Sequence, residues 1–405
     1  MTRRQRLAAL VAGLVSASSA FAQIAVTGAT VHTAAGEPLT DTVVVIEDGK
    51  ISRVGPASEI EIPNGFRTLA AAVVTPGLID AHATIGLSGY LNQEHDQDQV
   101  ETSDPVQPEL RAIDAYNPLE PLVEWARGYG VTTLHTGHAP RSLISGQTAI
   151  LKTRGLTLEE ALVKPVAMIA ATFGEGARAR GNKAPGTRAK MAAMLRAELI
   201  KAREYLDQLA SDDKDKRPDR DLRLEALGLV LEGSVPLLVT AQRAQDILTV
   251  LRIREEFDIP VVLDGVAEAY EVVDQIRDAG VSVIVHPTMM RAQGETENLS
   301  FETAARLYAA GIPTALQGGY EPYVPKSRLV LFEAAVAAAH GLGFDDALRS
   351  ITIDAARVLG VDNRIGSIEV GKDGDLALYD GDPFEYSTHC VAVIIEGEVV
   401  SEEIR

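Results

Sequence analysis

The stretch "PGLIDAHATIGL", residues 76–87, decides how this chain is interpreted. A Pro-Gly turn leads into a short apolar run that ends at Asp80, Ala81 and His82. A continuous apolar run of this length, bounded by turn residues, predicts a buried strand. Polar side chains at the end of such a strand are well placed to serve a functional site, so Asp80 and His82 are candidate site residues.

Further short apolar runs follow, and they alternate with stretches of helical character. With the opening strand they give eight candidates, at residues 73–82, 131–137, 148–153, 167–173, 236–241, 260–265, 282–287 and 313–319. Eight strands separated by helices favour a TIM-like (β/α)8 barrel over an open sheet. The sequence therefore predicts an α/β fold with a barrel spanning residues 76–364.

Both ends of the chain have a different, strand-rich character. Residues 23–75 contain "TVVVIEDGKISRVG", with β-branched runs on either side of Asp48-Gly49, a type I′ hairpin signal. Residues 365–405 contain "VAVIIEGEVV", which has the same pattern. We expect the two ends to pair as a small composite β-sandwich beside the barrel.

Two segments interrupt the alternation of strands and helices. Residues 88–116 are polar and acidic and follow the first barrel strand, which predicts a lid loop over the mouth. Residues 174–233 separate the fourth and fifth strands and contain "TRAKMAAMLRAELIKAREYLDQLA", which predicts a helical insertion.

Residues 1–22 have the features of a cleaved signal peptide. Three arginines precede a short apolar run, and Ala20-Phe21-Ala22 fits an A-x-A cleavage site. The run is too short to span a bilayer, so we expect a bacterial periplasmic protein that is not held in the membrane after cleavage. The net charge of −19 argues against nucleic acid as a partner, and the single cysteine, Cys390, excludes an intramolecular disulfide.

Several phrases together resemble the amidohydrolase superfamily, in its exported imidazolonepropionase-like or Xaa-Pro-dipeptidase-like branch. They are "VVTPGLIDAH" at 73–82, "GVTTLHTG" at 130–137, "SGQTAILKTRG" at 145–155 and "IGSIEVGKDGDLALYDGDP" at 365–383. The resemblance covers nearly all of the chain beyond residue 22. It implies a metal-bearing barrel that hydrolyses non-peptide or dipeptide C–N bonds.

The resemblance also implies a set of metal ligands, which this chain largely lacks. The family has His-x-His on strand one, often a carboxylated Lys on strand four, His on strands five and six, and Asp on strand eight. Here His82 matches but Thr84 replaces the second His, and the fourth strand has no Lys. Thr240 and Asp264 stand where strands five and six would carry His, and Gly319 stands at the Asp position. The neutral hydroxyl of a threonine is a poor ligand for a borderline-soft divalent metal such as zinc.

Two functions remain open from the sequence. In the first, the protein is catalytically silent or weak, binds no cofactor, and acts as a binding or partner subunit. In the second, it is an active hydrolase of small amides, lactams or short peptides with one divalent metal (Zn, Mn or Fe). That metal would sit in a rebuilt site made from His82, His135, His286 and Asp264.

Residues near the predicted mouth of the barrel also suggest what the protein binds. Arg111 and Arg291 lie in segments that could reach it, and an Arg side chain can pair with a carboxylate in two places at once. We therefore expect a small-molecule or peptide-like ligand. We also expect a homo-oligomer or a hetero-complex with an active amidohydrolase relative.

Overall fold

The computed structural model describes residues 23–179, 181, 183–213, 215, 217–288, 290, 292–320 and 329–405. The predicted signal peptide, residues 1–22, and the predicted ligand-binding Arg291 lie outside the described residues. None of the helices in the described part of the chain combines the length and apolar character that crossing a membrane requires.

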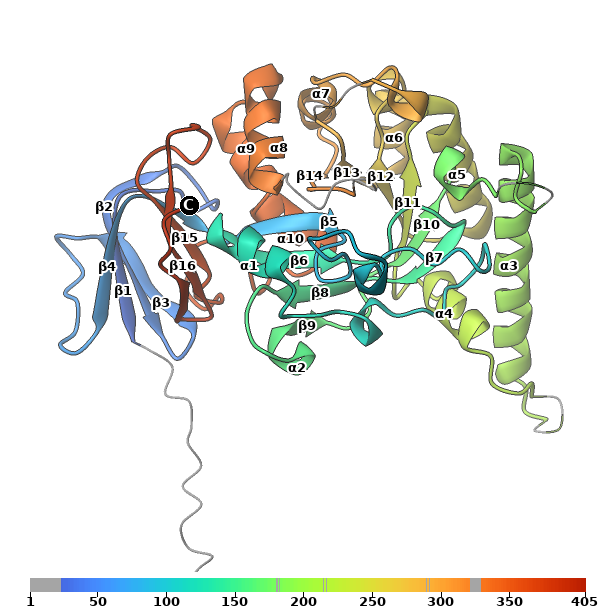
Figure 1. The fold of residues 1–405 in the computed structure, drawn as a ribbon, viewed down its shortest axis with the longest axis horizontal. Helices are drawn as coiled ribbons and strands as arrows, with labels where there is room; N and C mark the ends of the chain where they lie inside the picture. The colour runs from blue at the N-terminus through green and yellow to red at the C-terminus, as the bar shows by residue number, and fades with distance from the viewer. Residues whose placement is uncertain are drawn as a thin grey trace, which may run out of the picture.

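The two ends of the chain build one mixed sheet of seven strands, at the left of Figure 1. Its order is β17-β16-β15-β4-β1-β2-β3. The strands are β1 (Ile24–Val31), β2 (Leu39–Glu47), β3 (Lys50–Pro56), β4 (Arg67–Pro76), β15 (Leu376–Tyr379), β16 (Cys390–Ile395) and β17 (Glu398–Ser401). Strand β4 joins the two ends, since it pairs parallel with β1 and antiparallel with β15. Asp48 and Gly49 both have positive φ in the tight β2–β3 turn, as a type I′ hairpin requires.

The remaining strands form two sheets. The six-stranded sheet has the order β14-β13-β12-β11-β10-β7, and the four-stranded sheet has the order β5-β6-β8-β9. The strands are β5 (Leu78–Ala83), β6 (Val131–Thr136), β7 (Ile144–Gln147), β8 (Ala149–Lys152), β9 (Leu162–Lys164), β10 (Ile169–Thr172), β11 (Leu237–Ala241), β12 (Val261–Gly265), β13 (Ser282–Val285) and β14 (Thr314–Leu316). The run from β10 to β14 is parallel throughout. The sheets meet where Ala83 bridges Gly319, whose N–H donates to the His82 carbonyl at 3.4 Å.

Two of the predicted strands differ from the regular barrel pattern. The candidate at 73–82 is divided at Gly77 between β4 in the terminal sheet and β5 in the four-stranded sheet. The candidate at 148–153, observed as β8, pairs antiparallel with β6. A parallel pair needs a crossover of about a dozen or more residues, usually a helix. The chain between β6 and β8 contains only β7 and short loops, so β8 cannot run parallel to β6.

Ten α-helices are described, and most of them lie against the two inner sheets (Figure 1). They are α1 (Pro121–Gly128), α2 (Leu158–Ala161), α3 (Arg188–Leu209), α4 (Leu222–Leu231), α5 (Ala244–Phe257), α6 (Val273–Ala279), α7 (Thr303–Ala309), α8 (Val330–Ala337), α9 (Phe344–Ser350) and α10 (Ile353–Leu359). Helices α3 and α4 supply the helical part of residues 174–233, and Thr187 and Asp221 cap their N-termini with side-chain hydrogen bonds.

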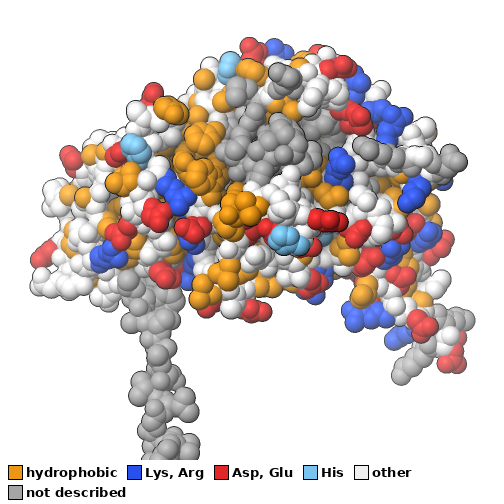
Figure 2. Space-filling model, viewed as in Figure 1, with side chains coloured by type: hydrophobic (Ala, Val, Ile, Leu, Met, Phe, Trp, Pro, Cys, Tyr) orange, Lys and Arg blue, Asp and Glu red, His pale blue; other side chains and the backbone are white. Residues whose placement is uncertain are grey.

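Residues 88–116 form a loop that carries two short 3₁₀ helices, η1 (Glu94–Asp96) and η2 (Ala112–Asp114). Backbone hydrogen bonds tie the loop to strand β7: the Gln147 N–H donates to Leu110 at 2.7 Å, and the Gln107 N–H donates to Ile144 at 2.9 Å. Figure 2 shows acidic and basic side chains interspersed over one face of the molecule, with hydrophobic side chains gathered near its middle.

Candidate functional site

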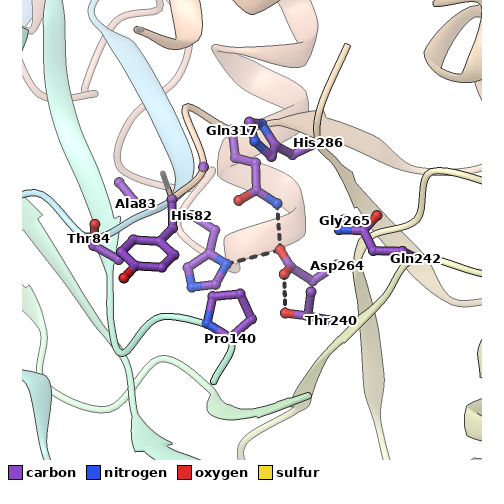
Figure 3. Close-up of a pocket in the computed structure, with 12 residues that line it drawn as sticks. His82, Ala83, Thr84, Pro140, Thr240, Gln242, Asp264, Gly265, His286 and Gln317 are labelled. Carbon is purple, nitrogen blue, oxygen red and sulfur yellow. Dashed lines mark hydrogen bonds and ion pairs between the residues drawn. The ribbon is translucent and has the colours of Figure 1, made fainter. Parts of the chain in front are cut away.

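One pocket lies where the ends of the parallel strands meet β5 (Figure 3). It encloses about 410 Å³. His82 comes from β5, Thr240 from β11 and Asp264 from β12, while His286 follows β13 and Gln317 follows β14. The C-terminal ends of parallel strands meet at one edge of a sheet, so residues as far apart in sequence as His82 and Tyr320 share this pocket.

Asp264 is the centre of the hydrogen bonds in this pocket. Its carboxylate accepts from His82 Nδ1 at 3.0 Å, from Thr240 Oγ1 at 2.5 Å and from Gln317 Nε2 at 2.6 Å (Figure 3). All four side chains are buried, with Asp264 only 2% exposed. A buried carboxylate is tolerated when donors satisfy its oxygens, and this one has three.

The three donors also favour the ionised form of Asp264. Burial by itself raises the pKa of this carboxyl, but the neighbouring His82 and the hydrogen bonds from His82, Thr240 and Gln317 outweigh burial and lower the pKa below its ordinary value. Asp264 is therefore an anion at neutral pH. An ionised carboxylate can only accept, so Nδ1 of His82 carries a proton and donates it to Asp264.

His135 is buried beside this pocket but does not line it. Its Nδ1 lies 2.6 Å from the Ala81 carbonyl oxygen, and its Nε2 lies 2.6 Å from Thr148 Oγ1. A carbonyl only accepts, so Nδ1 donates to Ala81 and Nε2 accepts from the Thr148 hydroxyl. Burial, and then the neighbouring His82, lower the pKa of His135 to about 3. His135 is a neutral residue that links β5, β6 and the start of β8.

We expect His135 to make the protein less stable in acid. The folded-state pKa of about 3 lies below the ordinary value of 6.5, so between these limits the unfolded chain binds a proton that the folded chain excludes. The free energy of unfolding should therefore fall by up to about 1.4 kcal/mol per pH unit below roughly pH 6. The stability that depends on a neutral His135 is fully present above about pH 6.5 and is lost as the pH falls.

Urea unfolding of the wild type and of His135→Gln between pH 7.5 and 4 measures the effect. The glutamine variant should be less stable at pH 7.5 and should have a shallower pH dependence. His95→Gln, which changes an exposed histidine of the 88–116 loop, is the control and should keep the wild-type slope. An unchanged slope in His135→Gln would contradict this assignment.

The chain resembles known proteins over most of its length. The crystal structure of an amidohydrolase from Thermotoga maritima MSB8 is 31% identical, covers 94% of this chain and 100% of its own, and superposes with a TM-score of 0.88. The chain belongs to the amidohydrolase family. The family model described as "Amidohydrolase family" matches residues 264–401.

More distant curated relatives of this amidohydrolase agree with the assignment. Imidazolonepropionase of Sphingopyxis alaskensis is 24% identical over 89% of this chain and 92% of its own length. The amidohydrolase tasK of Hapsidospora irregularis is 25% identical over 87% of this chain but only 39% of its own length. The chain thus spans about two fifths of that relative.

The resemblance to metal-dependent hydrolases implies a bound metal in this pocket. Among the described residues, no group of three or more His, Cys, Asp or Glu side chains is arranged to hold a metal ion. His82 and Asp264 contact each other, and both nitrogens of His135 are engaged in hydrogen bonds away from the pocket. A catalytic zinc needs about three protein ligands with one position open. The pocket residues that the structure describes do not fit such a metal.

The surroundings of Thr84 and Gly319, two of the positions predicted to be altered, differ in kind. The Thr84 hydroxyl accepts from Ser88 Oγ at 2.8 Å, so it stabilises the start of the 88–116 loop. Gly319 has a φ of +71°, and a Cβ built there would lie 2.3 Å from the His286 ring. His286 therefore occupies the space that an aspartate at position 319 would need.

The structure brings together most of the residues predicted from sequence. His82, Thr84, Thr240, Asp264, His286 and Gly319 all line the pocket. His135 and Arg111 do not: Arg111 is exposed and lies 4.0 Å from Asp114. His135 points to Ala81 and Thr148 rather than into the pocket.

Gln317, which donates to Asp264, was missed by the sequence reasoning. It follows β14 directly, and that position was the available signal. Glutamine is not a metal ligand of the family, so a search for ligands passed over it. Gln242 also lines the pocket, and its side-chain oxygen accepts from the Ala267 N–H at 3.0 Å.

Proposed function

We propose that this amidohydrolase-family protein is catalytically silent or weak and acts as a binding or partner subunit. The observation that carries the proposal is the Asp264 carboxylate, whose oxygens are taken by His82, Thr240 and Gln317. These donors stabilise the buried charge that a metal ion would otherwise neutralise.

The chemistry of amide hydrolysis supports the proposal. A bound zinc ion lowers the pKa of water from about 15.7 to about 7 and so supplies the nucleophile. General acid–base help from a positioned side chain is typically worth about 10²–10⁴-fold. The pocket has His286 packed against Gly319 where the family has an aspartate, so this chain lacks the group that assists the metal-bound water.

A pocket without turnover can still bind. Its polar lining suits a small-molecule or peptide-like ligand, and the whole chain could associate with a second copy or with an active amidohydrolase relative. The sequence features of residues 1–22 support export to a bacterial periplasm as the place of action.

A second candidate is a hydrolase of small amides, lactams or short peptides. The arrangement of His82 and Asp264 favours it, because a carboxylate that holds Nδ1–H leaves Nε2 as a base on a residue that lines the pocket. A rebuilt site with one Zn, Mn or Fe ion is the metal-dependent form of this candidate. Among the described residues that line the pocket, it would draw on His82, Asp264 and His286.

Metal content separates the two candidates. We expect the purified protein, prepared without chelator and soaked with Zn²⁺, Mn²⁺ or Fe²⁺, to retain fewer than about 0.1 equivalents by elemental analysis. The double variant Thr84→His/Thr240→His, which returns imidazoles to two altered positions, should retain about one equivalent and so prove the assay sensitive. About one equivalent in the wild type, or metal-independent turnover of amides that His82→Ala abolishes, would contradict the silent assignment.

A further inference from the structure

A second, solvent-open cavity lies near the strands β7 and β10. The space between its walls, including open solvent at its mouth, is about 1300 Å³. One wall comes from the 88–116 loop at residues 102–105, a second from Arg141 and Ser142 before β7, and a third from residues 176–179 with Lys183 and Ala184. The third wall begins within η3 (Glu175–Ala177), a 3₁₀ turn after β10.

The walls of this cavity carry an excess of positive charge. Arg141, Arg178 and Lys183 line it and are exposed, and within the described residues none of them forms an ion pair. Arg178 uses its Nε to donate to the Gly186 carbonyl at 3.1 Å, which leaves four N–H donors of its guanidinium. The one carboxylate in the lining, Asp104, lies 3.3 Å from Arg223 and is partly neutralised by it.

This concentration of cations is unusual for the chain as a whole. The net charge is −19, and most arginines of the described residues are paired with Asp or Glu, as Arg188 is with Asp246 and Glu295. Cations that share one concavity repel each other, and an anion placed among them removes that repulsion. Arginine also binds carboxylate and phosphate oxygens in a two-pronged geometry.

The cavity adjoins the pocket described above. Pro140 lines the pocket and Arg141, the next residue, lines the cavity. Gly176 packs so closely on Pro140 that a Cβ there would lie 2.4 Å from the Pro140 carbonyl oxygen. Consecutive residues therefore line the two spaces, which places the cavity next to the pocket.

We propose that the cavity is a binding site for a small anionic ligand, whose carboxylate or phosphate group is held by Arg141 and Arg178. This site goes beyond the proposed function and does not depend on it. It requires neither a metal nor turnover in the pocket, so metal content and anion binding can fail separately.

Isothermal titration calorimetry on the full mature chain at low ionic strength tests the site, with citrate, inorganic phosphate and neutral succinamide as probes. We expect citrate or phosphate to bind and succinamide not to bind, and the preference between the two anions identifies the group that the site takes. Arg141→Gln and Arg178→Gln should each weaken anion binding by roughly tenfold or more.

The control is Arg277→Gln, which removes an exposed arginine of α6 far along the chain from the cavity and should leave anion affinity unchanged. Thermal unfolding of each variant verifies the fold, and exposed side chains should change it little. The proposal is overturned if no anion binds at about 10 mM. It is also overturned if succinamide binds equally well, or if the Arg277 variant loses as much affinity as the other two.

Discussion

The variant Asp264→Ala is expected to lose about 3–5 kcal/mol of unfolding free energy at pH 7. The substitution removes the acceptor for His82, Thr240 and Gln317 at once, and all three donors are buried. A buried donor left without a partner costs its full desolvation penalty, which exceeds the net value of the hydrogen bond that was lost. Chemical denaturation followed by circular dichroism measures the change.

Two further variants make this result specific. Asp274→Ala removes an exposed carboxylate of α6 and should change stability by less than about 0.5 kcal/mol. Asp264→Asn keeps the size and part of the hydrogen bonding but removes the charge, so it should fall between the two. A loss below about 1 kcal/mol for Asp264→Ala would contradict the role assigned to this carboxylate.

Asp264→Asn should also change the response to acid. The folded-state pKa of Asp264 lies below its ordinary value, so its contribution to stability is present above the unfolded-state pKa of about 3.9 and is lost as the pH falls through the folded value. The asparagine variant cannot titrate there and should lose less stability between pH 4 and pH 2.

Lys152→Met is expected to cost about 3–5 kcal/mol of unfolding free energy. Lys152 lies at the end of β8 and is 1% exposed, and its ammonium forms an ion pair with Asp375 and lies 3.4 Å from Asp373. Both carboxylates precede β15 in the terminal sheet. The substitution leaves Asp375 buried without its cation, at the contact between the terminal sheet and the four-stranded sheet.

The neighbouring cations determine which carboxylate is left without an ion-pair partner in the Lys152→Met variant. Asp373 keeps Lys50 at 2.5 Å and Arg364 at 2.9 Å, so it remains paired in the variant. Burial holds the pKa of Asp375 above its ordinary value even with Lys152 present. Without Lys152 the cost of the Asp375 charge rises further, so this residue is the origin of the expected loss.

A surface pair and a double variant provide the controls. Lys201→Met breaks an exposed pair with Glu198 on α3 and should cost no more than about 0.5 kcal/mol. Lys152→Met/Asp375→Asn removes both charges of the buried pair and should recover part of the loss, because Asn can still accept from the Glu396 N–H. Equal losses for Lys152→Met and Lys201→Met would show that the buried pair has no special role.

The sequence alone predicted much of the strand pattern. The candidates at 236–241, 260–265 and 282–287 correspond to β11, β12 and β13 with small shifts at their ends. Continuous runs of Val, Leu and Ile mark parallel strands that are buried on both faces, and this signal is local. The same reasoning was wrong for 148–153, since strand direction depends on the length of the connection and on which neighbours are available.

The sequence by itself also predicted which family positions are altered, because residue types at Thr84, Thr240 and Gly319 can be compared without coordinates. Only the tertiary structure decided what the replacements do. Asp264 accepts from residues 182 and 53 positions away, and His135 is held by a backbone carbonyl 54 positions away. Such contacts depend on strand register and on the path of the chain. The physical reason is that hydrogen bonds and burial act through space, whereas sequence patterns report only on near neighbours along the chain.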